Sequence, residues 1–218
     1  MARLAGPPPT DEPMATLRRA RPDDAHAVAP LILEAAPHLR LLLGGDHEAW
    51  HAAEHAFRTE RTMYGWKWGM IAEDVTDLAG FVIAFPGKRW GSLKLGTSVG
   101  LARAAGVKHA RDLVRRGRVL DRLHPPVPEW TLYVSALAVH PEHRRSGIAT
   151  TLMDRVIAGA EHLGLAVAVD VDLDSDAAWA LYDSLGFVQA ESREAGEAER
   201  ELLETVGFAR LVRHGGRE

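Results

Sequence analysis

The stretch Val139-His-Pro-Glu-His-Arg-Arg-Ser-Gly-Ile-Ala-Thr-Thr151 joins a predicted strand to a predicted helix. The near-continuous apolar run Thr131–Val139 indicates a strand covered on both faces, and apolar residues recurring through Ile148–Leu163 indicate one face of a helix. A helix N-terminus carries unpaired N–H groups and a partial positive charge, so it attracts anions. Gly147 leaves room there for a ligand, and neighbouring arginines and threonines add donors. The stretch therefore predicts a pyrophosphate-binding turn.

Strands and helices alternate on both sides of this turn, which predicts a single mixed α/β domain over residues 14–215. Residues 1–13 contain three consecutive prolines and are expected to be a disordered lead-in. The segment 87–128 is expected to be an insertion, with a loop and then one or two amphipathic helices near Val99–Ala104 and Lys108–Leu123. Further strands are expected at Ala15–Arg21, Trp68–Glu73, Leu78–Phe85, Ala166–Val171, from Phe187 to Gln189 and at Gly207–Arg213, and further helices at 24–35, His47–Arg61, Ser175–Leu185 and Ser192–Thr205.

Composition excludes several classes of protein. The formal net charge of -4 lacks the basic excess of a general nucleic-acid binder. The chain has no cysteine, so disulfides, thiolate zinc sites and cysteine nucleophiles are excluded. No apolar run approaches the ~20 residues needed to cross a bilayer, and the first residues lack the apolar core of a secretory signal. We expect a cytoplasmic protein that binds neither nucleic acid nor membrane.

Two motifs in a fixed order carry a resemblance. Arg144, Gly147 and Ala149 match [Gln/Arg]-x-x-Gly-x-[Gly/Ala], and Ser175-x-x-Ala-x-x-Leu-Tyr-x-x-Leu-Gly-Phe187 follows. The run Leu132–Gln189 resembles the GCN5-related N-acetyltransferase (GNAT) superfamily. The resemblance implies a central, mixed, mostly antiparallel sheet of about six or seven strands, splayed between the fourth and fifth, with helices on both faces. It also implies a homodimer.

The resemblance further implies where the cosubstrate, acetyl-CoA, binds. Main-chain groups of the fourth strand would hold the pantetheine arm, the amides after His143 would hold the pyrophosphate, and Tyr182 would protonate the CoA thiolate. Ser175 stands where the family often has Asn, and we expect Asp174 or Asp176 to cap the helix there. The predicted cosubstrate-binding residues are Leu137, Ala138, Val139, Arg144, Arg145, Ser146, Gly147, Ile148, Ala149, Thr150, Ser175, Ala178 and Tyr182.

The general base stays open. Some family members carry a Glu eleven positions before the first motif residue, where this chain has Tyr133, so Tyr133 is expected to orient the acceptor or the acyl group. A water relay is an alternative, as are four carboxylates: Glu73, Glu129, Asp170 and Asp172. The acceptor, a small-molecule or peptide amine, is not specified by the sequence. We expect the segment 87–128 to set its specificity, together with an aromatic lining from Trp66, Trp68 and Trp90.

A second motif points to different chemistry. His47-Glu-Ala-Trp-His51 matches H-E-x-x-H, which on a helix places two zinc ligands on one face and a Glu as base. His55 extends that face by a turn. A zinc-dependent hydrolase is therefore one alternative to the acyltransferase, and a CoA-binding module without catalysis is another.

Overall fold

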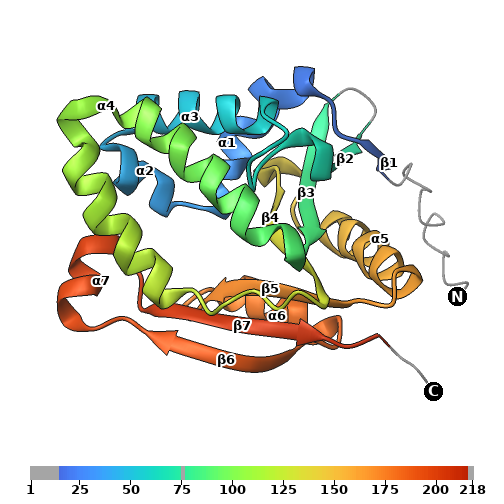
Figure 1. Ribbon diagram of the computed structural model, residues 1–218. Helices are drawn as coiled ribbons and strands as arrows, with labels where there is room; N and C mark the ends of the chain where they lie inside the picture. Colours follow the sequence, from blue (N-terminus) through green and yellow to red (C-terminus); the bar gives the residue numbers. More distant parts are fainter. Residues whose placement is uncertain (1–14, 75–76, 216–218) are drawn as a thin grey trace, which may run out of the picture.

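The computed structural model describes residues 15–74 and 77–215, apart from the side chains at positions 107 and 108. The expected lead-in at 1–13 lies outside these residues. The described strands form one sheet in the order β1-β2-β3-β4-β5-β7-β6 (Figure 1). All neighbours pair antiparallel except β4 and β5, which are parallel. The strands are β1 (Thr16–Arg19), β2 (Gly69–Glu73), β3 (Leu78–Pro86), β4 (Thr131–Val139), β5 (Ala166–Asp172), β6 (Val188–Glu194) and β7 (Gly207–Arg213).

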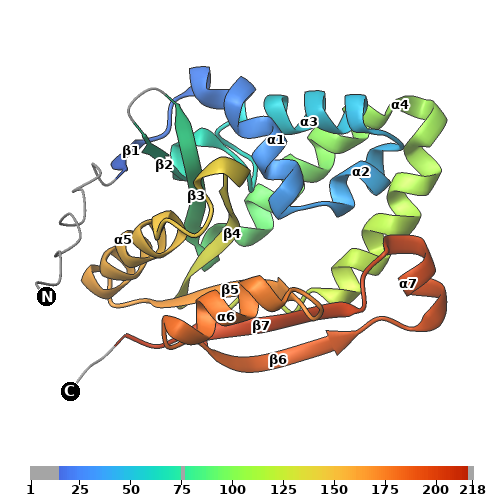
Figure 2. The same cartoon turned by 180° about the vertical axis from the view of Figure 1, so that it is seen from behind.

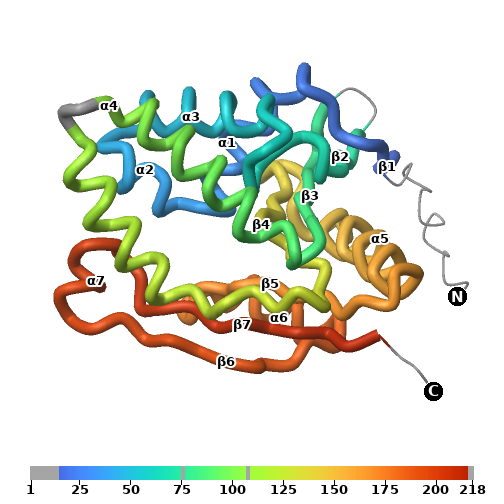
Figure 3. The backbone as a smooth tube through the Cα atoms, in the orientation of Figure 1, coloured from blue at the N-terminus to red at the C-terminus, as the bar shows by residue number. Residues whose placement is uncertain are grey.

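The sheet opens in its middle, between β4 and β5. Only Thr131–Val134 of β4 pairs with Ala166–Val169 of β5, so the last residues of both strands face a gap. Ser135, the first unpaired residue of β4, is also an extra residue in the pairing with β3. Such a bulge bends and twists a strand, which turns the end of β4 away from β5. The predicted splay is confirmed, and Figure 3 shows β5, β7 and β6 as a layer apart from β1 to β4.

Helices cover both faces of the sheet. One face carries α1 (Ala25–Ala35), α2 (His38–Leu43), α3 (Asp46–Arg58), α4 (Trp90–Leu123) and α7 (Glu197–Leu203). The other carries α5 (Ile148–His162) and α6 (Asp176–Ser184), seen from behind in Figure 2. Short 3-10 turns occur at Pro22–Asp24, Trp66–Trp68, Gly87–Arg89 and Pro141–His143. Since β4 contributes side chains to the apolar clusters on both faces, its sequence is mostly apolar, with Thr131 and Ser135 as its polar residues.

The inserted segment folds differently from the prediction. Its first part is not a loop, because helix α4 starts at Trp90 and runs to Leu123 with one kink at Gly106, where φ is 62°. Glycine weakens an isolated helix, which is why sequence favoured a loop. Tertiary packing accounts for Gly96, since a Cβ there would stand 1.9 Å from the Arg61 carbonyl oxygen. Figure 1 shows α4 crossing from α3 towards α7.

Two smaller differences concern short elements. Helix α2 was not predicted, because six residues are too few for a clear period; Gly44, in the left-handed region at φ 81°, closes it. Strand β6 continues to Glu194, so residues 192–194 are not helical as expected, and α7 begins only at Glu197. Of the helices that the structure describes, none is long and apolar enough to cross a membrane.

Candidate active site

The turn between β4 and α5 exposes a row of backbone donors. Arg145 and Gly147 have positive φ angles of 65° and 82°, and Gly147 caps α5. Within the described residues, none of the N–H groups from Arg145 to Thr150 donates a hydrogen bond to the chain. A Cβ built on Gly147 would meet nothing within 4 Å, so the space in front of these donors is open. Such a concave set of N–H groups at a helix N-terminus suits a diphosphate.

Arg144 holds the base of this turn. Its Nε donates to the Val139 carbonyl oxygen at 3.2 Å, and its Nη2 lies 2.5 Å from Oε2 of Glu34 on α1. The first contact ties the turn to the end of β4, and the second joins it to the opposite helix layer. Arg145 and Ser146 are exposed beside it.

The edge of β4 that faces the gap offers further backbone groups. His140 donates its N–H to Ala79 on the β3 side. Since backbone groups alternate sides along a strand, the N–H groups of Leu137 and Val139 point into the gap, and that of Ala138 points towards β3. The gap edge can therefore bind an extended amide-containing chain as an added strand.

A cavity of about 1170 Å³ opens at the splay. Its walls come from the ends of β4 and β5, from α2 and α4 on one side, and from α6 on the other. It brings together predicted site residues that lie far apart in sequence. Those that line it are Tyr133, Leu137, Ser175, Ala178 and Tyr182.

Tyr182 combines burial with an unused hydroxyl. The side chain is 4% exposed and packs edge-on against Phe187, with ring centroids 5.2 Å apart. Its hydroxyl has no hydrogen-bond partner among the described residues, although it borders the cavity. Burial raises the pKa of Tyr182 above its usual value, so the phenol keeps its proton at neutral pH. This arrangement suits a proton donor to a group in the cavity.

The start of α6 differs from the prediction in one detail. Ser175 is the N-cap residue, and its side chain makes no capping hydrogen bond. Neither Asp174 nor Asp176 supplies the expected cap in the described structure. Instead Asp174 contacts Asp172, the last residue of β5.

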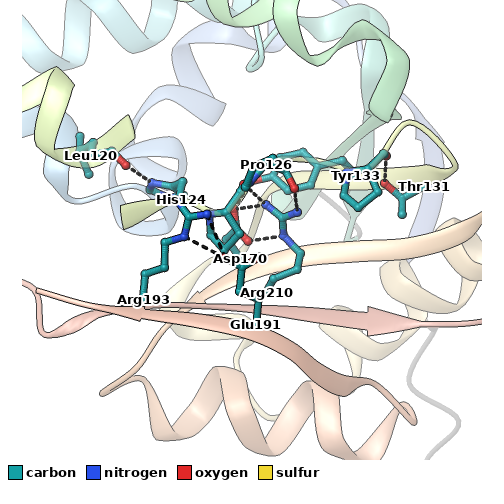
Figure 4. Close-up of polar contacts among 11 residues, drawn as sticks. Leu120, His124, Pro126, Thr131, Tyr133, Asp170, Glu191, Arg193 and Arg210 are labelled. Atoms are coloured by element: carbon teal, nitrogen blue, oxygen red, sulfur yellow. Dashed lines mark hydrogen bonds and ion pairs between the residues drawn. The ribbon is translucent and has the colours of Figure 1, made fainter. Parts of the chain in front are cut away.

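Tyr133 belongs to a buried polar network beneath the cavity (Figure 4). Its hydroxyl donates to Oδ2 of Asp170 at 3.0 Å, and the Asp170 carboxylate also receives Nε and Nη2 of Arg210. Arg210 further donates to the carbonyl oxygens of Pro126 at 2.8 Å and Pro125 at 2.7 Å. Burial, followed by the charge of Asp170, raises the pKa of Tyr133 well above its usual value. The network fixes the link from α4 to β4, and the role predicted for Tyr133 stays a prediction.

Sequence reasoning did not foresee the partnership of Asp170 and Arg210. Each is a charged residue flanked on both sides by apolar residues within its strand, and that was the available signal. Which residues would meet depends on the register of β5 with β7, where these two are direct partners. The cavity also contains two histidines, His38 and His124, that the sequence gave no reason to select.

The H-E-x-x-H motif lies on α3, away from this cavity. Nε2 of His47 and Nε2 of His51 are 3.2 Å apart on the exposed face. In the part of the chain that the structure describes, no three His, Asp or Glu side chains are placed to hold a metal ion. A catalytic zinc site needs three protein ligands, so this geometry does not favour the hydrolase.

The sequence model of the acetyltransferase (GNAT) family matches residues 46–187, more than half of the chain. The chain belongs to the acetyltransferase (GNAT) family. The match contains both motifs, the splayed strands and Tyr182. No curated protein matches the chain in sequence.

Solved structures share the GNAT fold at low sequence identity. An N-acetyltransferase from Staphylococcus aureus Mu50 has a TM-score of 0.65 and 20% identity, over 91% of this chain and 100% of that one. The yncA structure from Salmonella typhimurium, solved with acetyl-CoA, has a TM-score of 0.56 and 14% identity, over 94% and 96%. Diaminobutyrate acetyltransferase EctA from Paenibacillus lautus, in complex with L-2,4-diaminobutyric acid and coenzyme A, has a TM-score of 0.55 and 17% identity, over 94% and 97%.

The four carboxylates considered as bases differ in their distance from the cavity and in their ion pairs. Glu73 pairs with Arg18 at 2.7 Å on the distant β1–β2 edge. Glu129 is exposed before β4 and does not line the cavity, and Asp170 is held in its network. Asp172 lines the cavity.

Helix α4 contributes to the cavity wall. Trp90 lines the cavity, whereas Trp66 and Trp68 pack against the apolar core and are not among the residues that line the cavity. Of the arginines on α4, Arg118 borders the cavity and Arg116 donates to the Leu41 carbonyl oxygen of α2.

Proposed function

We propose that this GNAT protein is an acetyl-CoA-dependent N-acetyltransferase that transfers the acetyl group directly to a primary amine. One observation carries the proposal: the unpaired N–H groups from Arg145 to Thr150 lie beside a gap between β4 and β5. The first feature suits the pyrophosphate and the second suits the pantetheine arm. The presence of acetyl-CoA in the yncA structure and of coenzyme A in the EctA structure supports it.

The residues at the gap suit the chemistry of direct transfer. A neutral amine attacks the thioester carbonyl, and an N–H of Leu137 or Val139 polarises the carbonyl oxygen. Tyr182 then gives its proton to the departing thiolate. Binding both substrates in one cavity lowers the entropic cost of bringing them together. The acceptor is a small-molecule or peptide amine.

The test combines a binding measurement with a turnover measurement. Calorimetric titration with acetyl-CoA should show binding to one site per chain, and a panel of amines should reveal release of free thiol. Tyr182→Phe should keep binding and lose turnover. Binding with no turnover on any amine would favour a CoA-binding module, whereas stoichiometric zinc with chelator-sensitive hydrolysis would favour the metal enzyme.

A further inference from the structure

The carboxylates that line the cavity differ in whether they form an ion pair with a cationic side chain. Glu34 pairs with Arg144, Asp121 with Lys94 at 2.7 Å, and Asp170 with Arg210. Within the described residues, Asp172 and Asp174 are the lining carboxylates that have no ion pair. They therefore keep negative charge available for a cation that enters the cavity.

Asp172 occupies the open side of the splay. It ends β5, three residues beyond Val169, where pairing with β4 stops. It shares a strand face with Asp170, the face that carries α1 to α4, because side chains alternate along a strand. The carboxylate is thus presented to the part of the cavity that α2 and α4 enclose.

Several contacts hold Asp172 in place and link it to the helix of Tyr182. Its Oδ1 accepts a hydrogen bond from Oγ1 of Thr205 at 2.9 Å. Its carbonyl oxygen accepts from the N–H of Ser175 at 3.1 Å and from Nε1 of Trp179 at 3.2 Å. Since Trp179 and Tyr182 both belong to α6, these contacts fix the position of Asp172 relative to Tyr182 within one cavity.

We propose that Asp172 is the general base that takes the proton from the acceptor's ammonium group. This inference rests on the proposed function. The carboxylate lies in the same cavity as Tyr182, a buried residue whose hydroxyl has no hydrogen-bond partner in the described chain, and no cation of that chain neutralises the carboxylate. An ammonium group is the cation that the reaction itself brings to this place.

The step balances in protons and bonds. The ammonium gives one proton to Asp172, which releases it to solvent. The nitrogen lone pair then forms the C–N bond, and the C–S bond breaks. Tyr182 protonates the thiolate, and the second proton lost by the nitrogen restores the phenol. The products are the amide, the free thiol and one proton.

The surroundings of Asp172 also suit a base near neutral pH. Partial burial, followed by the hydrogen bond and charge of Asp174, raises the pKa of Asp172 to about 6. The carboxylate is therefore ionised at pH 7 and more basic than an exposed aspartate. Other titratable or charged groups around the cavity are Glu34, His38, Tyr64, Lys94, Arg118, Asp121, His124, Tyr133, Asp170, Asp174, Tyr182 and Arg193.

The experiment measures kcat/KM against pH with the best amine of the panel, because this ratio reports groups of the free enzyme. The wild type should lose activity on acidification, with a midpoint near pH 6. Asp172→Asn should lower kcat by about 10²- to 10⁴-fold and abolish this acid limb, with the acetyl-CoA affinity unchanged. Calorimetry and thermal melting of the same variant confirm that it is folded.

Two further variants separate Asp172 from its neighbours. Asp174→Asn removes the charge that adds to the effect of burial on the pKa of Asp172, so the acid limb should move to lower pH. His124→Gln should keep the limb near its wild-type position. An acid limb that persists in Asp172→Asn, or one that disappears in His124→Gln, overturns the assignment. A wild type that acetylates no amine instead refutes the proposed function, and the inference with it.

Discussion

Removing one partner from the buried pair of Asp170 and Arg210 should lower the free energy of unfolding by a large amount. The two side chains are 4% and 3% exposed, so replacing one leaves the other as an uncompensated buried charge. Such a loss costs about 3–5 kcal/mol. At roughly 2–4 °C per kcal/mol for a chain of this size, Arg210→Met or Asp170→Asn should lower the melting temperature by roughly 6–20 °C.

The double variant makes this reasoning sharper. With both charges gone, no ion is stranded, and the remaining cost comes from the hydroxyl of Tyr133 and the carbonyls of Pro125 and Pro126. The double variant should therefore be no less stable than either single one, with a coupling energy of about 3 kcal/mol or more.

Urea unfolding followed by circular dichroism, with constant m-values, gives the required free energies. Arg213→Met is the matched control on the same strand: Arg213 pairs with Glu161 at 3.2 Å, with side chains 29% and 45% exposed. Arg213→Met should lower the free energy of unfolding by about 1 kcal/mol or less. The account of a buried, coupled pair would be refuted if the two single losses of unfolding free energy added up in the double variant. It would also be refuted if each single loss were as small as that of the control.

Three further predictions concern the site. Tyr182→Phe should lower kcat by about 10²- to 10⁴-fold in a thiol-release assay while calorimetry shows the acetyl-CoA affinity unchanged; a fall in affinity alone would contradict a proton-donor role. Gly147→Ala, at φ 82°, adds about 1–2 kcal/mol of strain to the binding turn and should weaken acetyl-CoA binding roughly 5- to 30-fold. Gly159→Ala, where a Cβ meets nothing within 4 Å, should leave the acetyl-CoA affinity unchanged. Equal losses of affinity in the two glycine variants would argue against acetyl-CoA binding at the turn of Gly147. Burial, followed by the charge of His124, lowers the pKa of His38 to about 3, so below about pH 6.5 the unfolded chain binds a proton at this position that the native chain does not. The melting temperature should therefore fall from pH 6.5 towards pH 4, and His38→Gln should make this fall smaller. Melting temperatures of the wild type and the variant that fall in parallel would contradict this prediction.

Local sequence sufficed for the elements around the binding turn. The bounds Thr131–Val139 and Gly207–Arg213 agree with the prediction, and α5 differs from it by one residue at its end. These segments combine a strong apolar pattern with a proline or glycine at an end, so their signals are local. The first half of helix α4 was predicted poorly because its glycines favour a loop locally, whereas Gly96 packs closely against Arg61, and such a contact is not encoded in any local window.

The sequence by itself determined the family, the fold class and the turn that offers its N–H groups, because these depend on residue types at short, fixed spacings. Only the tertiary structure decided which charges are already paired and which remain available. Asp170 and Asp172 are the same residue type two positions apart, yet β7 places Arg210 against the first, whereas the second faces the cavity without an ion pair in the described chain. That difference arises from strand register and burial, which set the partner and the solvation of each charge.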